Sequence, residues 1–412
     1  MLHFFGQSLG ISKRLSSPAR LMSSLALAAM LSIASMPVAM ANSADFVRSL
    51  WPQAEARGVS RQAFEAAFAG YSPIRQVMEL TRKQPEFSQT VQQYLGKRIT
   101  DAQAQKGRAM RGEWNQTLSG AQQRYGVQPE IVLAIWGMET NFGGYMGGNN
   151  TIHALATLTE GGYRTDFFRN ELLTALRIVS DGHVTPSKMV GSWAGAMGHT
   201  QFMPSSFMRY AVDYNGDGRK DIWNSVPDAL GSTANYLKAF NWRPGETWGY
   251  EVKLPRGFDF AAARQIERAQ LGKWQAMGIQ RVSGKPFPRP NDVGRLYLPA
   301  GANGPAFLLL PNFDVIKRYN NSDSYALAVG HLADRIIGGG DFATPWPAGD
   351  YALNKNQRAE LQSLLNRAGF NVGTPDGVIG PKTRAAVMAY QSRAGLAADG
   401  HVSGRLLDAL KR

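Results

Sequence analysis

Glu139 is the residue whose position most needs a chemical explanation. It follows the apolar run 131–138, and in a helix Ile131, Ile135 and Glu139 recur every four residues, so the carboxyl group continues the buried face. A carboxyl group in apolar surroundings has a raised pKa and holds its proton near neutral pH, as a general acid must. The alternative is a structural carboxylate bonded to a backbone group or an Arg.

A second set of side chains has the spacing of a cation-binding loop. Segment 213–221 reads Asp-Tyr-Asn-Gly-Asp-Gly-Arg-Lys-Asp, with oxygen side chains at loop positions 1, 3, 5 and 9 and Gly at position 6. An EF-hand loop places hard oxygen ligands for calcium in this pattern. Position 12 is Asn224 instead of Glu, and Asp228 is the nearest acid that could replace it. An Asx-rich surface turn is the alternative interpretation.

A third segment, 191–207, combines many small residues with Ser192 and Gln201. Small residues allow close backbone approach, and the polar side chains could hydrogen-bond a sugar. A glycine-rich helix junction inside a packed core would have the same composition. The residues alone therefore leave both interpretations open.

The N-terminus has the pattern of a secretory signal. Residues 1–41 contain three basic residues and no acid, an apolar segment at 21–38, and a small-x-small site at Ala39-Met40-Ala41. We expect a cleaved signal peptide and a soluble periplasmic protein with no membrane anchor after cleavage; an uncleaved anchor is the alternative. The chain has no cysteine, which excludes disulfides, thiolate metal sites and a lipidated N-terminal cysteine.

The charge balance points to a polyanionic partner. The formal charge of +14 includes three basic residues of the signal, so +11 remains afterwards. Because the chain is exported and has no recognisable nucleic-acid motif, a cell-surface polymer is favoured over nucleic acid.

The elements that must position these residues are mainly helical. Periodic apolar positions predict helices in segments such as 61–68, 87–95, 167–179 and 324–337. Between about 248 and 310 the pattern changes to short β-rich runs at 250–254, 296–298 and 307–310, broken by Gly and Pro. Three glycines at 338–340 open a Pro-containing linker, and we expect few contacts across it.

The C-terminal segment contains an internal repeat. Asp376-Gly377 and Asp399-Gly400 each lead into a short helix, and Pro381 lies near the first turn of one of them. With Leu361-Gln362, Gly380-Pro381-Lys382-Thr383 and Tyr390-Gln391, the segment resembles the peptidoglycan-binding domain at the ends of many bacterial wall enzymes. A generic three-helix adaptor is the alternative.

Taken in order, the motifs of the larger region resemble those of the lytic murein transglycosylase B family. They are ETNFG at 139–143, GAMG at 195–198, QFMPSS at 201–206, the aspartate loop, ANYL at 234–237, and YN at 319–320 followed by Tyr325. The resemblance covers about residues 44–337. It implies a mainly α protein whose lysozyme-like core has helical flanks and a small β-containing insertion, followed by a small three-helix C-terminal domain.

The resemblance and the linker divide the chain into four segments. They are a signal peptide at 1–41, a catalytic domain at 42–340 with its core at about 116–245 and 311–337 and its insertion at about 246–310, a linker at 341–351, and a peptidoglycan-binding domain at 352–412.

The resemblance also assigns roles residue by residue. Glu139 matches the catalytic acid and base. The residues that match the glycan cleft are Arg164, Ser192, Gln201, Tyr236, Tyr319, Asn320 and Tyr325. Those that match the structural calcium loop are Asp213, Asn215, Asp217, the backbone of Arg219, and Asp228, whose spacing is one residue longer than usual. The implied partners are peptidoglycan glycan strands, with complexes of wall synthesis or hydrolysis proteins left open.

The implied reaction cuts the β-1,4 bond between N-acetylmuramic acid and N-acetylglucosamine and leaves a 1,6-anhydro sugar. It needs one carboxyl group and no catalytic cofactor, whereas a common glycosidase needs two acids, and no second acid is paired with Glu139 in a comparable motif. A hydrolytic muramidase and a non-catalytic wall-binding scaffold are the two alternatives.

Overall fold

The computed structural model describes residues 36–82 and 89–412, with side chains from residue 43 onward. Most of the predicted signal peptide therefore lies outside the described residues. The chain divides into two compact units, each assembled from separate stretches of sequence. Among the described residues, the first comprises 36–82, Met146–Arg209 and Asp217–Asn224; the second comprises 89–145, Tyr210–Gly216 and Ser225–Arg412.

The first unit is helical, with one short β-ladder. Its elements are α1 (Met36–Ala56), α2 (Arg61–Phe68), α3 (Arg75–Arg82), β1 (Asn149–Asn150), α8 (Thr151–Glu160), α9 (Thr165–Ser180), η1 (Pro186–Lys188), β2 (Val190–Gly191) and most of α10 (Pro204–Tyr210). Helix α8 packs along α9, and the fully buried Leu155, Leu172 and Leu176 belong to these two helices. Strands β1 and β2 are antiparallel.

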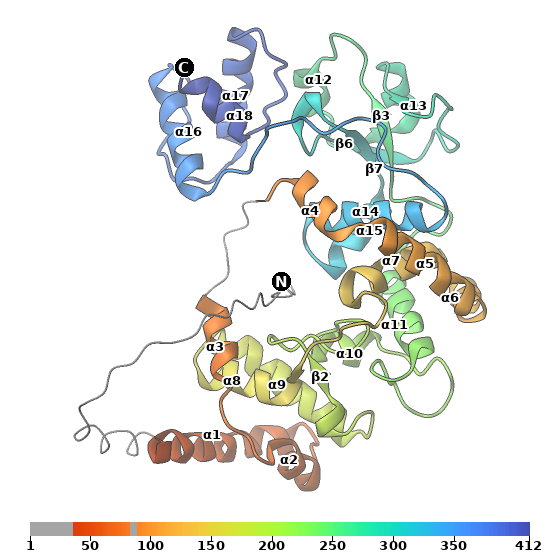
Figure 1. The fold of residues 1–412 in the computed structure, drawn as a ribbon, viewed down its shortest axis with the longest axis vertical. Helices are drawn as coiled ribbons and strands as arrows, with labels where there is room; N and C mark the ends of the chain where they lie inside the picture. Colours follow the sequence, from red (N-terminus) through yellow and green to blue (C-terminus); the bar gives the residue numbers. More distant parts are fainter. Residues whose placement is uncertain (1–35, 83–88) are drawn as a thin grey trace, which may run out of the picture. The chain divides into compact units, whose positions relative to one another are not determined.

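The helical core of the second unit surrounds one buried helix, α7 (Pro129–Thr140). It packs against α5 (Asp101–Glu113), α6 (Asn115–Tyr125), α11 (Val226–Ala239) and α15 (Asp323–Ile336), as Figure 1 shows. Helices α4 (Val91–Arg98) and α14 (Pro311–Tyr319) pack against α15 in turn. Helix α7 is apolar on every side, which is typical of a helix with no solvent face.

The β-containing insertion forms a five-stranded antiparallel sheet in the order β4-β6-β7-β3-β5. The strands are β3 (Gly249–Lys253), β4 (Ala269–Gln270), β5 (Gln280–Arg281), β6 (Val293–Tyr297) and β7 (Ala306–Leu309), with α12 (Phe260–Arg264), α13 (Leu271–Ala276) and η2 (Gly301–Asn303) between them. Trp274 is fully buried against the sheet, and its indole Nε1 donates to the carbonyl oxygen of Gly294 at 3.0 Å.

The C-terminal module consists of α16 (Lys355–Arg367), α17 (Pro381–Arg393) and α18 (Gly404–Leu410), packed around Leu361, Leu365 and Leu407. The sequence repeat has a structural basis. The Gln362 amide oxygen accepts from the N–H of Gly377 at 2.8 Å, while the Gln391 amide oxygen accepts from the N–H of Gly400 at the same distance. In each case the amide Nε2 of the same Gln donates to the Asp that precedes the Gly.

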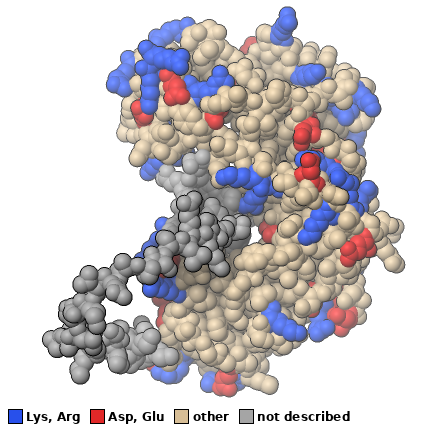
Figure 2. Space-filling view, viewed as in Figure 1, with Lys and Arg blue, Asp and Glu red and all other residues tan. Residues whose placement is uncertain are grey.

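Basic side chains gather on this module, as Figure 2 shows. From residue 352 to the end, nine Lys and Arg residues stand against four Asp and Glu residues. The excess of positive charge predicted for the whole chain is therefore present in this small part of it, where it attracts acidic polymers.

The linker packs on the surface that it crosses. The expectation of few contacts across it is wrong, because Asp399 Oδ2 of the C-terminal module accepts from the N–H of Ala302 in η2 at 2.6 Å. The Glu251 carboxylate accepts from the backbone N–H groups of Ala343 and Thr344, both at 2.8 Å. The Phe342 ring stacks on the His331 imidazole with 4.0 Å between centroids. Composition concealed these contacts, because a Gly- and Pro-rich segment can also be held by the surface it crosses.

The mainly α fold predicted from the sequence is confirmed. Helix α2 occupies the predicted segment, and α9 and α15 agree with theirs to within two residues. Helix α4 begins later than predicted, after a capping box formed by Thr90 and Gln93. In the part of the chain that the structure describes, no helix is long and apolar enough to cross a bilayer.

Candidate active site

Glu139 lies in the last turn of α7, where the helix ends abruptly. Pro129 begins the helix, and Asn141 ends it in the left-handed conformation with φ 51°, while its N–H donates to the carbonyl oxygen of Gly137. The predicted burial of the Ile131 face is confirmed, since Ile131 and Ile135 are both buried. Glu139 keeps part of its surface accessible, as a group that meets a substrate must.

The Glu139 carboxyl group has the electrostatics of an acid that is protonated near neutral pH. Burial raises its pKa to about 7. The Tyr325 hydroxyl donates to Glu139 Oε1 at 2.5 Å, and this bond, together with the positive charge of Arg98, opposes the rise because both favour the carboxylate. Burial is the largest of the three effects, so the Glu139 carboxyl group keeps its proton up to near neutral pH.

The turn that follows Glu139 is strained and firmly supported. Asn141, Phe142 and Gly143 all have positive φ, at 51°, 56° and 75°, which is costly for a bulky Phe. The Lys106 ammonium donates to the Asn141 carbonyl oxygen at 2.7 Å. A turn held in this way fixes the direction of the carboxyl group one turn earlier.

Two glycines make room for the Phe142 ring. A Cβ added at Gly137 would lie 2.7 Å from Phe142 Cζ, and one added at Gly107 would lie 3.1 Å from the same atom. The Trp136 ring meets Phe142 edge-on at 5.6 Å. The Phe142 ring therefore packs tightly against α5 and α7, and this packing stabilises the strained turn.

Tyrosines surround the carboxyl group. The rings of Tyr236 and Tyr319 lie 4.9 Å apart between centroids, and the Tyr236 hydroxyl donates to the Arg318 carbonyl oxygen at 2.6 Å. Burial raises the pKa of Tyr319 and Tyr325 well above the usual range, with the charge of Glu139 as the second cause. These phenols remain neutral donors at any physiological pH. Asn320, which follows α14, belongs to the same unit.

Sequence reasoning missed two residues of this site, Tyr94 and Arg98. Burial raises the pKa of Tyr94 to about 12, and the charge of Glu139 adds to the rise, while Arg98 lowers the pKa of Glu139. They lie four residues apart on α4, and the Arg98 guanidinium lies 5.4 Å from the centre of the Tyr94 ring. An aromatic and a cation at this spacing on one helix face were the available signal.

Three predicted cleft residues belong to the first unit. The Arg164 guanidinium lies over the Phe167 ring at 4.6 Å. Ser192 Oγ accepts from the N–H of Ala196 at 3.0 Å, so its hydroxyl supports the glycine-rich turn. Gln201 has φ 50°, and its Nε2 donates to the Met146 and Gly198 carbonyl oxygens at 3.0 and 2.9 Å. The glycine-rich segment is therefore held by its own polar side chains.

The aspartate loop is divided between the two units. In the second, Asp213 Oδ1 accepts from the N–H of Gly216 at 2.7 Å, and the fully buried Asp228 accepts from the N–H groups of Tyr214 and Asn215 at 2.9 and 3.2 Å. In the first, Asp217 Oδ1 accepts from the N–H of Arg219 at 2.9 Å.

The donor set is compatible with a hard cation, although it is not a cluster of acids. Over the described ranges, no group of three or more His, Cys, Asp or Glu side chains is placed to hold a metal ion. The predicted ligands, however, include an amide oxygen at Asn215 and a backbone carbonyl at Arg219, which calcium also accepts. Asp228 supports the loop through its two backbone bonds.

Two family models match this chain. A family model described as "Transglycosylase SLT domain" matches residues 42–334, and one described as "Putative peptidoglycan binding domain" matches residues 354–410. Membrane-bound lytic murein transglycosylase B of Escherichia coli (strain K12) is 38% identical over 256 residues, which are 59% of this chain and 66% of that protein.

Solved structures extend the similarity to almost the whole chain. SltB3 from Pseudomonas aeruginosa, in complex with NAG-anhNAM-pentapeptide, is 47% identical with a TM-score of 0.83, covering 90% of this chain and 99% of that one. The Escherichia coli lytic transglycosylase Slt35, in complex with calcium, is 33% identical with a TM-score of 0.59, covering 72% and 92%.

Proposed function

The chain belongs to the transglycosylase SLT domain family, as a lytic murein transglycosylase B-like protein with a C-terminal peptidoglycan-binding domain, and we propose that it cleaves peptidoglycan between N-acetylmuramic acid and N-acetylglucosamine. The product would carry 1,6-anhydromuramic acid. The observation that carries this proposal is the Glu139 carboxyl group, which has a pKa of about 7 and accepts a hydrogen bond from Tyr325.

One carboxyl group suffices for the reaction. Protonated Glu139 donates its proton to the glycosidic oxygen as the bond from that oxygen to the muramic acid C1 breaks. The muramic acid 6-hydroxyl oxygen then bonds to C1, and its proton passes to the Glu139 carboxylate, which restores the acid. No water is consumed. Tyr325 stabilises the carboxylate that exists between the two proton transfers, because its hydroxyl donates to Oε1.

We assign the glycan contacts to residues of the matching motifs. Tyr236, Tyr319 and Asn320 are proposed to orient the sugar beside Glu139, since the phenols share its surroundings. Arg164, Ser192 and Gln201 are proposed as further cleft residues on the strength of their motifs. Slt35 was solved in complex with bulgecin A. SltB3 was solved in complex with NAG-NAM-pentapeptide and with NAG-anhNAM-pentapeptide. The pentapeptide-bearing disaccharide is the substrate unit that we propose for this chain.

We also propose that the aspartate loop binds a structural calcium ion. Asp213, Asn215, Asp217, the Arg219 carbonyl oxygen and Asp228 would supply oxygen ligands, and calcium would stabilise the fold without taking part in the reaction. Slt35 was solved in complex with calcium. Thermal unfolding with calcium and with chelator tests this. Calcium should raise the Tm of the wild type and leave that of Asp213→Ala unchanged, whereas coincident wild-type curves would leave only an Asx turn.

The rest of the chain would bring the enzyme to its polymer. We propose that residues 1–41 direct it to the periplasm and that the basic module at 352–412 binds the wall, beyond a catalytic domain at 42–340 and a linker at 341–351. Removing 352–412 should weaken binding to insoluble peptidoglycan, which a pull-down measures. Unchanged binding after truncation would contradict the role of the module.

The decisive experiment for the reaction is digestion of purified sacculi followed by mass analysis. We expect 1,6-anhydromuropeptides, each lighter by one water than the corresponding muramidase product. Reducing-end muramic acid from the wild type would identify a muramidase instead. Intact sacculi after digestion, with binding retained, would identify the scaffold alternative.

A further inference from the structure

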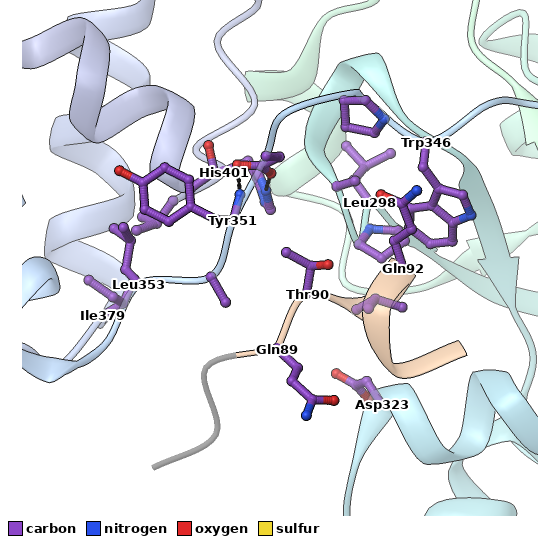
Figure 3. Close-up of a pocket in the computed structure, with 18 of the residues that line it drawn as sticks. Gln89, Thr90, Gln92, Leu298, Asp323, Trp346, Tyr351, Leu353, Ile379 and His401 are labelled. Carbon is purple, nitrogen blue, oxygen red and sulfur yellow. Dashed lines mark hydrogen bonds and ion pairs between the residues drawn. The ribbon is translucent and has the colours of Figure 1, made fainter. Parts of the chain in front are cut away.

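A cavity of about 560 Å³ lies within the second unit, where the C-terminal module, the linker, the insertion and the start of α4 meet. Its volume is in the range of small-molecule sites. Figure 3 shows contributions from each of these segments. They include Gln92 of α4, Leu298 of the insertion, Trp346 of the linker, and Leu353 and Ile379 of the module.

The walls of this cavity are held together by specific bonds. Asp399 Oδ2 of the module accepts from the N–H of Ala302 in η2 at 2.6 Å. The Arg264 guanidinium of α12 donates to the Pro381 carbonyl oxygen at 3.5 Å. The linker is fixed on the same side by Glu251, as described above. The cavity is therefore a formed feature of the unit with walls from several segments.

The two carboxylates that line the cavity already have partners of their own. Asp323 is paired with the Lys317 ammonium at 2.7 Å, and Asp350 lies 3.7 Å from the His401 imidazole and accepts from a backbone N–H at 2.9 Å. The Arg358 guanidinium, in contrast, donates to two backbone carbonyl oxygens at 2.8 and 3.3 Å.

Arg384, which also lines the cavity, has no carboxylate partner in the part of the chain that the structure describes. Burial and the neighbouring Arg264 guanidinium lower the pKa of Arg384. A guanidinium group without a carboxylate partner favours an added anion. Tyr297 and Trp346 also line the cavity and supply apolar surface, so the site suits an organic anion.

We propose that this cavity binds the peptide stems of peptidoglycan through a carboxylate that pairs with Arg384. The proposal rests on the proposed function, and it adds a peptide site to the glycan contacts around Glu139. The muramic acid carboxyl group is consumed in the amide bond to the peptide, so the free carboxylates of the polymer belong to the stems. A chitin oligomer, which has neither stems nor lactyl groups, offers Arg384 no charge.

Calorimetric titration of the full chain tests the proposal without turnover. The probes are a free pentapeptide stem, the same peptide with every carboxyl group amidated, a peptide-free chitin oligomer, and inorganic phosphate. The free peptide should bind, and amidation should weaken binding by roughly tenfold or more, which is the contribution of a charge-assisted hydrogen bond. Equal affinity for the amidated peptide, or for phosphate alone, would overturn the proposal.

Two pairs of variants locate the site. Arg384→Gln should weaken peptide binding by roughly tenfold, whereas Arg367→Gln, the loss of an exposed arginine elsewhere on the module, should not. Gly301 and Gly284 have φ of +70° and +71°, so alanine causes the same backbone strain at both. Only at Gly301 would the Cβ meet another group, Asp399 Oδ2 at 2.6 Å, while nothing lies within 4 Å at Gly284.

Gly301→Ala should therefore weaken peptide binding, and Gly284→Ala should leave it at the wild-type value. If both members of either pair bind the peptide equally well, the site lies elsewhere. The two proposals fail separately. Anhydro products from sacculi without peptide binding would remove only the peptide site, and peptide binding without anhydro products would remove only the reaction.

Discussion

Glu139 and Asp334 are two carboxyl groups of the same unit with nearly the same pKa and very different surroundings. Burial is the largest cause at both positions and raises each pKa to about 7. Each also accepts one side-chain hydrogen bond that opposes the rise. The donor is the Tyr325 hydroxyl at 2.5 Å for Glu139 and the Trp248 indole at 3.2 Å for Asp334.

The surroundings decide what each proton can do. Glu139 precedes a strained turn and is surrounded by phenols that remain neutral donors. Asp334 lies beside the buried Trp248, and its backbone carbonyl oxygen accepts from the N–H of Gly339 where the linker begins. A raised pKa therefore marks a buried acid, and only the groups around it mark a catalyst. The predictions below test this contrast.

The largest difference should be in turnover. Glu139→Gln keeps the shape and the hydrogen bond from Tyr325 but has no proton to donate, so kcat should fall by roughly two to four orders of magnitude. Asp334→Asn makes the same chemical change at the other acid and should leave turnover within about twofold. Release of soluble muropeptides from sacculi measures both rates. Comparable losses in the two variants would show that burial, and not the surroundings of Glu139, governs the reaction.

The second prediction concerns what the two acids have in common. Each binds its proton more tightly in the folded chain than in the unfolded one, with pKa values of about 7 against 4.5 for Glu139 and 3.8 for Asp334. Both therefore favour the fold at low pH, and this stability is lost as the pH rises through 7. Between pH 5 and pH 8 the unfolding free energy of the wild type should decline, and Glu139→Gln and Asp334→Asn should each make that decline smaller by about 2–3 kcal/mol.

Urea unfolding of the wild type and the two variants at both pH values measures this effect. The double variant should be the least sensitive to pH, since the two acids have different hydrogen-bond partners and their effects should add. If the unfolding free energy of the wild type changed between pH 5 and pH 8 no more than that of the double variant, the raised pKa values would be contradicted.

The contrast between the acids also shows what the sequence can predict. The burial of Glu139 follows from its four-residue spacing from Ile135, because both lie on one helix. The Asp-Gly repeat likewise predicts the two short helices α17 and α18, because each turn is adjacent in sequence to its helix. Local periodicity carried these predictions because a helix fixes which side chains share a face.

Contacts between distant segments were not predictable in this way. The pKa of Asp334 depends on Trp248, which is 86 residues away, and Tyr325 is 186 residues from Glu139. Motif resemblance supplied Tyr325, but nothing supplied Tyr94, Arg98 or the packing of the linker on Glu251. Such pairings depend on how helices and strands pack, which composition and periodicity do not predict.

A third prediction separates the two acids by their hydrogen-bond donors. The Tyr325 hydroxyl favours the Glu139 carboxylate, so Tyr325→Phe should raise the pKa of Glu139. Activity that needs the protonated acid falls as the pH rises above this pKa, so the alkaline limb of kcat/KM should move upward by about one pH unit. Tyr236→Phe removes a phenol that donates to a backbone carbonyl instead, so its limb should stay in place even if turnover falls.

The smallest expected effect belongs to Arg98, whose charge lowers the pKa of Glu139 less than the bond from Tyr325 does. Arg98→Gln should move the alkaline limb in the same direction as Tyr325→Phe but only by a few tenths of a pH unit, roughly the scale of a partly screened charge. Arg111→Gln removes the same charge at an exposed position of α5 that does not shift the pKa of Glu139, so it should leave the limb unchanged. Added salt distinguishes the two mechanisms, because it screens the charge of Arg98 but not the hydrogen bond from Tyr325. The difference between Arg98→Gln and the wild type should therefore shrink as ionic strength rises, while the Tyr325→Phe shift persists. A salt-independent shift in Arg98→Gln, or one as large as that of Tyr325→Phe, would mean that Arg98 acts by positioning the site and not by its charge.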